Sequence, residues 1–168
     1  RTKDYIPDQP IKFSHKAHAG QNKIDCKYCH SIATQSKSAG FPSANLCMNC
    51  HKVVVAGTRS GKFEIKKIYR AVESGKPIEW VRVHKLPDHA FFSHAQHVSA
   101  GQVQCQTCHG PVETMDLIKQ VSDLSMGWCV NCHRQTEIKA TTNKYYESFK
   151  AIQDDARAGK KITAERLG

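Results

Sequence analysis

Four copies of one short cysteine motif constrain this chain more than any other feature. All eight cysteines fall in pairs of the form C-x-x-C, and a histidine directly follows each pair. The four stretches read C-K-Y-C-H, C-M-N-C-H, C-Q-T-C-H and C-V-N-C-H. The cysteines are Cys26, Cys29, Cys47, Cys50, Cys105, Cys108, Cys129 and Cys132, and the histidines are His30, His51, His109 and His133. The chain is therefore organised around four copies of one motif, each with two thiols and one imidazole.

C-x-x-C-H is the attachment signature of c-type haem. Two cysteines three residues apart lie on one side of a helical turn. There, each thiol can form a thioether to one of the two vinyl groups of a porphyrin. The next residue lies under the iron, and its imidazole can serve as the proximal ligand. The motifs predict four covalent haem c groups, on the pairs Cys26/Cys29, Cys47/Cys50, Cys105/Cys108 and Cys129/Cys132.

Zinc is the main alternative. Seventeen residues separate Cys29 from Cys47 and twenty separate Cys108 from Cys129, which is at or near the spacing of four-cysteine zinc sites. Two such sites would use all eight cysteines, but zinc gives no reason for a histidine after every pair. A disulfide framework fails for the same reason, and no βαβ setting for a thioredoxin-like pair is visible. We therefore favour haem.

Six histidines lie outside the motifs, and four of them belong to an internal repeat. F-S-H-x-x-H occurs at 13–18 and again at 92–97, with the same distance to the following C-x-x-C-H. The repeats cover 13–52 and 92–134, and residues 53–91 connect them. Histidines three apart share one helix face but cannot both ligate the distal side of one iron. We expect His15 and His94 to serve the first haem of each repeat, and His18 and His97 to serve other haems.

F-x-H-x-x-H ahead of C-x-x-C-H resembles the class III multihaem cytochromes, and this resemblance implies that the four histidines are distal ligands. His84 is a further distal candidate, whereas His89 is expected at the surface. Six candidates for four irons leave no need for an open coordination position, which favours electron transfer over haem catalysis. Met126 could ligate an iron and raise its potential, but packing is favoured for Met126 and for Met48. Met115 stays undecided.

The remaining pattern predicts a mainly α chain with little regular secondary structure. We expect a single multihaem domain over 1–168, built from two repeated dihaem modules. Only 39% of the residues are hydrophobic, as expected if porphyrins fill the core. Residues 1–12 read as an extended arm, 57–76 as a helix and 78–83 as a short extended segment. A second helix is expected at about 143–158, packed on the haem core through Tyr145, Phe149, Ile152 and Ala156.

The formal net charge of +10 first suggests a nucleic-acid ligand. Four haems would add eight propionates and four ferric charges, which brings the holo-protein to about +6 when oxidised and to roughly +2 when reduced. The haems thus explain the basic residues, and we expect no nucleic-acid partner. No apolar run approaches the roughly 20 residues that span a bilayer. The chain begins at Arg1 without a signal pattern, so we interpret it as a mature or trimmed segment.

The segments between the motifs resemble one family, the pentahaem cytochrome subunit of alternative complex III, a bacterial quinol-oxidising membrane complex. The resemblance rests on F-S-H-K-A-H-A-G (13–20), K-I-D-C-K-Y-C-H-S (23–31), P-S-A-N-L-C-M-N-C-H-K (42–52), S-G-K-F-E-I-K-K-I (60–68), W-V-R-V-H (80–84) and G-W-C-V-N-C-H-R (127–134). It implies an electron-transfer subunit with an iron–sulfur partner and integral-membrane partners, on the periplasmic side of the inner membrane.

The chain departs from this family at both ends. The family has five haems and a membrane-anchoring helix, whereas four motifs and no such helix are present. Residues 161–168 are similar to the stretch before the family's last motif, so we expect a fifth haem beyond Gly168. The alternatives are a stand-alone tetrahaem carrier, a small membrane-anchored quinol dehydrogenase, or a multihaem enzyme such as a nitrite or hydroxylamine reductase. A high-spin, five-coordinate haem would favour the last of these.

Overall fold

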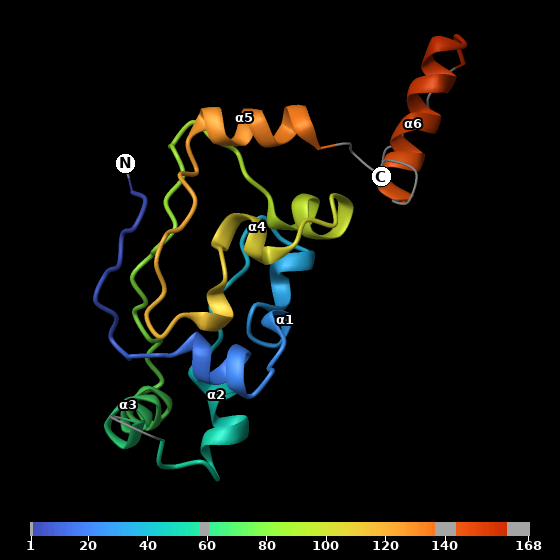
Figure 1. Ribbon diagram of the computed structural model, residues 1–168. Helices are drawn as coiled ribbons and strands as arrows, with labels where there is room; N and C mark the ends of the chain where they lie inside the picture. Colours follow the sequence, from blue (N-terminus) through green and yellow to red (C-terminus); the bar gives the residue numbers. More distant parts are fainter. Residues whose placement is uncertain (1, 58–60, 137–143, 161–168) are drawn as a thin grey trace.

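The structure, a computed structural model, describes residues 2–57, 61–136 and 144–160. Within these ranges it is helical and contains no β-strand, and its short helices alternate with long irregular segments (Figure 1). The elements in chain order are η1 (Lys16–Gln21), α1 (Cys26–Cys29), η2 (Ser31–Thr34), α2 (Ala44–His51), α3 (Gly61–Ser74), η3 (Gln96–Ala100), α4 (Cys105–His109), η4 (Val112–Thr114), α5 (Met126–Gln135) and α6 (Lys144–Arg157). This confirms a mainly α chain with little regular secondary structure.

The two sequence repeats have the same order of backbone elements. Each has a short π-helix at F-S-H-x-x-H, a helical turn with the first cysteine pair, a 3-10 turn, and a longer helix with the second pair. An uncommon left-handed residue recurs as well: Lys23 and Gln102, each three positions before the first cysteine, have φ angles of 56° and 52°. The repeat therefore extends from sequence to backbone conformation.

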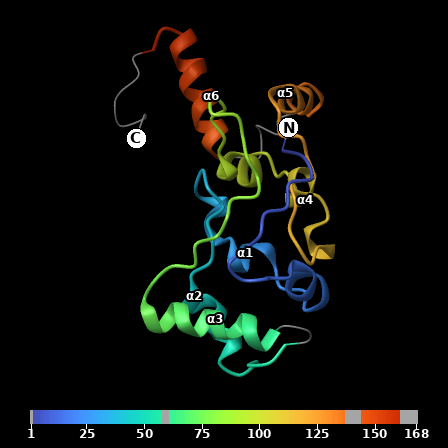
Figure 2. The same cartoon turned by 90° about the vertical axis from the view of Figure 1, so that its left-hand side faces the viewer.

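Extended segments connect the helical parts. Residues 2–12, 78–86 and 116–124 run beside one another on one side of the molecule (Figures 1 and 2). The backbone of Asp4 donates to the oxygen of Gln120 at 2.7 Å. The side-chain amide of Gln9 bonds both the N–H and the oxygen of Val81, at 3.0 and 2.8 Å. These contacts hold the arm and the 78–83 segment in the extended form that the sequence predicts.

Helix α3 fills much of the connector and falls within the expected range 57–76, of which residues 58–60 lie outside the described residues. Its buried face carries Ile65 and Ile68. Ile68 joins Ile11 and Met48 in a small hydrophobic cluster, which links α3 to the second cysteine motif on α2. Gly75 ends the helix in the left-handed conformation, with φ of 65°, as is common for a glycine after a helix.

We expect Ile68→Ala to lower the free energy of unfolding by about 2–5 kcal/mol, the cost of truncating a buried aliphatic side chain. Phe63 on the same helix is 72% exposed, so Phe63→Ala is the matched control and should change stability by less than about 0.5 kcal/mol. Chemical denaturation of the two variants measures both effects. Equal losses in the two variants would contradict the position of the core.

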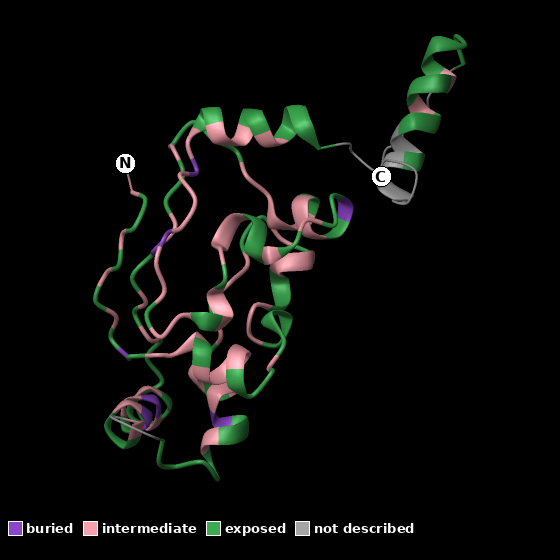
Figure 3. Cartoon of the chain, viewed as in Figure 1, coloured by how far each residue is buried: buried purple, intermediate pink, exposed green. Residues whose placement is uncertain are grey.

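Hydrophobic burial is sparse elsewhere. Among the described residues, the buried hydrophobic side chains are Ile11, Met48, Ile65, Ile68, Val83, Ala100 and Leu124. Figure 3 shows them as isolated patches in a chain that is mostly half-buried or exposed. A chain of this size normally encloses a continuous apolar core.

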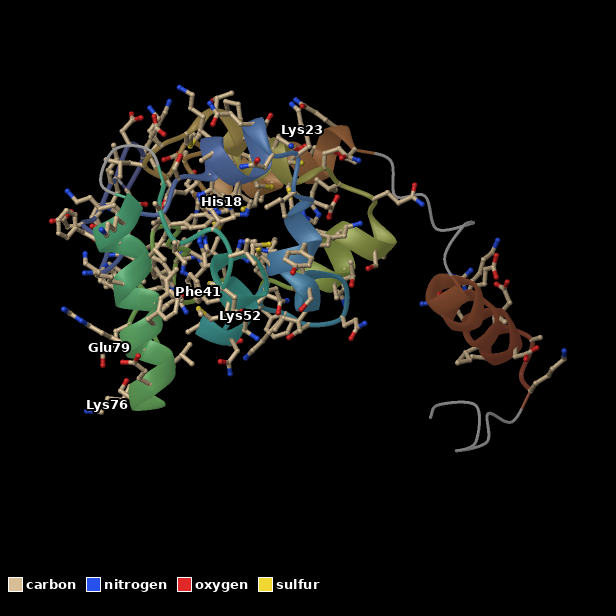
Figure 4. All side chains as sticks on the ribbon, turned by 90° about the horizontal axis from the view of Figure 1, so that it is seen from below. His18, Lys23, Phe41, Lys52, Lys76 and Glu79 are labelled. Carbon is tan, nitrogen blue, oxygen red and sulfur yellow. The ribbon has the colours of Figure 1, made fainter. Side chains whose placement is uncertain are left out.

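Helix α6 confirms the helix expected at about 143–158, and Gly159, with φ of 71°, ends it. The expected packing of its apolar stripe on the haem core stays a prediction, since the side chains of Tyr145 and Phe149 lie outside what the structure describes. Helix α6 stands apart from the other helices in both Figure 1 and Figure 4, and Ala156 in the stripe is exposed. Six of its fourteen residues are charged, so water can solvate this helix without a protein partner.

Candidate haem-binding site

The four C-x-x-C-H motifs coincide with four helices or helical turns. Helix α1 begins at the first cysteine of its motif and α4 begins at Cys105, whereas α2 and α5 carry their motifs in the later turns. A side-chain cap starts two of them: Asp25 accepts from Lys27 N at 2.7 Å, and Ser125 accepts from Trp128 N at 3.4 Å. All eight thiols are unpaired, and none is fully buried. Each pair therefore lies on one side of a turn, as thioether formation needs.

The F-S-H-x-x-H segments hold their second histidine in the same way. Nδ1 of His18 lies 2.8 Å from the backbone oxygen of Ser14, and Nδ1 of His97 lies 2.8 Å from that of Ser93. A carbonyl oxygen can only accept, so Nδ1 carries the proton and Nε2 keeps a free lone pair. Metal-ligating histidines are typically oriented by such a bond from the other ring nitrogen.

The phenylalanine of each segment orients both of its histidines. The Phe13 ring stacks on His18 with 4.2 Å between ring centres and meets His15 edge-on at 4.9 Å. Phe92 repeats this geometry, at 4.4 Å from His97 and 4.9 Å from His94. Sequence reasoning did not assign these phenylalanines a role. The feature of the sequence that points to them is the phenylalanine at the first position of both F-S-H-x-x-H segments.

Three pairs of histidine rings face each other at a spacing that one metal ion can bridge. A metal–imidazole bond is about 2 Å long, and the ring centre lies about 1 Å farther, so two rings on opposite sides of one iron have centres roughly 6 Å apart. The observed pairs are His18 and His51 at 6.1 Å, His97 and His133 at 5.9 Å, and His94 and His109 at 6.3 Å. Each pair joins one F-S-H-x-x-H histidine to one motif histidine.

Three more histidines are anchored through Nδ1 to a backbone oxygen. The distances are 2.8 Å from His30 to Gly40, 2.8 Å from His51 to Val54 and 2.9 Å from His94 to Lys37. Together with His18 and His97, five rings thus present a free Nε2. The paired spacing, the free Nε2 atoms and the unpaired thiols all fit haem c, with the motif histidine on one side of the iron and a repeat histidine on the other.

Burial keeps the histidines at the centre neutral. Burial, followed by the nearby His30, lowers the pKa of His15 to about 4. Burial, followed by the nearby His84, lowers the pKa of His109 to about 3. Near pH 7 both rings are therefore in the neutral form that a metal requires. Nδ1 of His15 is buried and makes no hydrogen bond.

His84 differs from the paired histidines. Its Nε2 lies 3.1 Å from Nδ1 of His109, and the two ring centres are 4.2 Å apart. This spacing is shorter than that of the three facing pairs. The structure thus places His84 against the proximal ring of the third motif, and its expected role as a distal ligand stays a prediction. His89 is exposed, as expected for a surface residue.

Met48 and Met126 were both expected to pack, but only Met48 is buried. Met48 is buried in the cluster with Ile11 and Ile68, which confirms packing. Packing of Met126 is wrong, because this side chain is 65% exposed. It is the first residue of α5. Among the described residues, no three His, Cys, Asp or Glu side chains converge on one metal position.

The described residues form a strand-free helical fold, and the geometry of their cysteines and histidines fits the attachment of haem c. The chain is similar to a protein described as "Menaquinone reductase, multiheme cytochrome c subunit" from Nitratidesulfovibrio vulgaris (strain Hildenborough). The two are 39% identical over 102 residues, which are 61% of this chain and 46% of that protein. The matched region thus spans about half the length of the relative. No family model matches the chain.

Proposed function

We propose that this chain is a multihaem c-type cytochrome subunit that relays electrons within a membrane-bound quinone oxidoreductase complex. The observation that carries the proposal is the set of facing histidine pairs, at 6.1, 5.9 and 6.3 Å between ring centres. A haem c supplies a one-electron redox centre. If two of these histidines held each haem, no place would be left for a substrate, so these residues would hold redox centres and would not assemble a catalytic iron. The chain is not an enzyme on its own.

The geometry lets us propose a ligand set. The proximal ligands are His30, His51, His109 and His133. His18 and His97 serve the second motif of each repeat, and His94 serves Cys105/Cys108. Burial and repeat position support His15 as the partner of His30. His84, whose pKa is lowered first by burial and then by His94, stays the further candidate ligand.

Two complexes are candidates for the setting. The resemblance of residues 13–134 supports a quinol-oxidising alternative complex III, in which electrons pass toward a periplasmic cytochrome or a terminal oxidase. The relative's description supports a menaquinone reductase, in which the quinone would receive electrons. Both settings place the quinone site on a partner. We propose alternative complex III first, with an iron–sulfur subunit and integral-membrane subunits as partners.

The location follows from the chemistry of attachment. We propose the periplasmic side of the bacterial inner membrane, because thioether attachment of haem takes place outside the cytoplasm. None of the described helices is both long enough and apolar enough to cross a membrane. Association with the membrane would therefore come from partner subunits or from an anchor segment. A fifth haem stays a proposal, since residues 161–168 lie outside the described residues.

The proposed relay predicts that the purified chain and the assembled complex differ in their reaction with quinol. The purified chain with its haems should be reduced and reoxidised by small redox mediators but should not oxidise quinol. The assembled complex should oxidise quinol, with these haems reduced during turnover. Stopped-flow absorbance of the haems measures both reactions. Rapid quinol oxidation by the purified chain would instead support the small quinol-dehydrogenase alternative. Turnover only with menaquinone as acceptor would support the reductase.

A further inference from the structure

The two repeats contact each other through matched hydrogen bonds. The backbone N–H of Lys16 donates to the oxygen of Met115 at 2.9 Å, and that of Ala95 donates to the oxygen of Ser36 at 3.0 Å. Both donors directly follow the first histidine of F-S-H-x-x-H. Both acceptors are the sixth residue after the first C-x-x-C-H histidine. Each repeat therefore donates one backbone hydrogen bond to the other repeat and accepts the equivalent hydrogen bond from it.

A second matched contact lies one turn further along. The Ser99 hydroxyl donates to the oxygen of Thr34 at 2.8 Å. At the equivalent position of the first repeat, Gly20 lies so close to the oxygen of Glu113 that a Cβ atom would collide with it. Both Ser99 and Gly20 are two residues after the second histidine, and both acceptors are four residues after the motif histidine. Glycine at position 20 is explained by this closer approach.

Reciprocal contacts of this kind define a two-fold axis, because residue i of one unit meets residue j of the other and the reverse also holds. Close to such an axis, a residue meets its own equivalent. Cys26 and Cys105, the first cysteines of the two repeats, behave in this way: burial raises the pKa of the Cys26 thiol, and the neighbouring Cys105 thiol raises it further. Lys27, inside the first motif, lines the same cavity as Cys105. The axis therefore passes between the first motifs.

The second motif of each repeat lies beside the first. Nδ2 of Asn49, in the second motif, donates to the hydroxyl of Tyr28, in the first, at 3.0 Å. In the other repeat, Phe92 contacts both His94 and His97, whose ring centres lie 6.3 and 5.9 Å from those of the motif histidines His109 and His133. Figures 1 and 2 show α2 and α5 at opposite ends, with α1 and α4 between them.

We infer that the four attachment sites form a row in the spatial order Cys47/Cys50, Cys26/Cys29, Cys105/Cys108, Cys129/Cys132, with a pseudo-two-fold axis between the central two. This order differs from the order along the chain, in which the Cys47/Cys50 site stands between two others. Redox partners would then exchange electrons with the two end sites, held by α2 and α5. The inference rests on the proposed four-haem relay.

The iron positions of the holo-protein test this order directly. Anomalous scattering at the iron edge from a crystal of the full chain should place the iron on His30 between those on His51 and His109. It should also place the iron on His109 between those on His30 and His133. An iron on His51 or His133 that lies inside the row would overturn the inference. The iron order does not depend on quinone chemistry, so loss of the proposed function in turnover assays would leave it standing.

A matched pair of variants tests the order in solution. Methionine in place of an axial histidine raises the potential of its haem. His18→Met should raise the potential of the Cys47/Cys50 haem and shift one neighbour, the Cys26/Cys29 haem. His94→Met should raise that of the Cys105/Cys108 haem and shift two neighbours. Redox titration followed by NMR of the haem methyl groups resolves each haem. A row in chain order would give two shifted neighbours for His18→Met as well, which contradicts the inference.

Discussion

The intact mass of the denatured protein, measured by mass spectrometry, is expected to exceed the polypeptide mass by four haem equivalents for residues 1–168. Thioether bonds survive denaturation, so the excess counts covalent attachment directly. Each of the four motifs offers two unpaired thiols on one helical turn. The double variant Cys129→Ser/Cys132→Ser should therefore lose one whole equivalent and retain three.

Phe63→Ala is the matched control for the mass experiment, since Phe63 is exposed on α3 and lies outside every C-x-x-C-H motif. It should retain four equivalents. A metal analysis that found zinc and no iron in the wild-type protein would contradict the haem interpretation. Retention of four equivalents in the double-serine variant would contradict the assignment of the fourth motif.

His97→Ala is expected to convert one haem of four from low-spin to high-spin. The His97 ring centre lies 5.9 Å from that of the proximal His133, and Phe92 and the Ser93 oxygen hold it in this position. Alanine removes the ligand and leaves the iron with one protein ligand. Electron paramagnetic resonance of the oxidised protein measures the change, which should come with an altered potential of that haem and little change in the others.

His89→Ala is the control for the spin-state experiment, because His89 is exposed and lies outside F-S-H-x-x-H. It should leave all haems low-spin. His18→Ala should reproduce the effect of His97→Ala at the Cys47/Cys50 haem, since the two repeats hold these rings alike. An unchanged spectrum in both repeat variants would refute the proposed distal ligands.

Local chemistry explains why much of the site could be predicted. Thioether attachment and proximal ligation involve residues within one helical turn, so their spacing is visible in the sequence. The same holds for the helical period of Ile65, Ile68 and Tyr69 in α3 and for Gly75, which ends that helix. Met48 was expected to pack, and it is buried beside its motif. A local pattern predicts these features because nothing distant is needed to form them.

Other features depend on contacts between distant segments. The expectation of a packed Met126 failed because the methionine lies at the exposed start of α5. The apolar stripe of α6 predicts a helix but not what the helix would touch, and its many charged residues allow it to stand in water. Amphipathic periodicity indicates which side of an element is apolar. It does not provide a partner surface.

The sequence alone predicts the cofactor class, the attachment residues and the pool of ligand histidines, because covalent and helical geometry act over a few residues. The tertiary structure alone decided which histidines face one another. His18 and His51 are 33 positions apart in the chain, and their ring centres lie 6.1 Å apart. It also decided that the repeats meet through reciprocal hydrogen bonds, from Lys16 to Met115 and from Ala95 to Ser36. Such pairings arise from packing between segments, and packing depends on the whole folded chain.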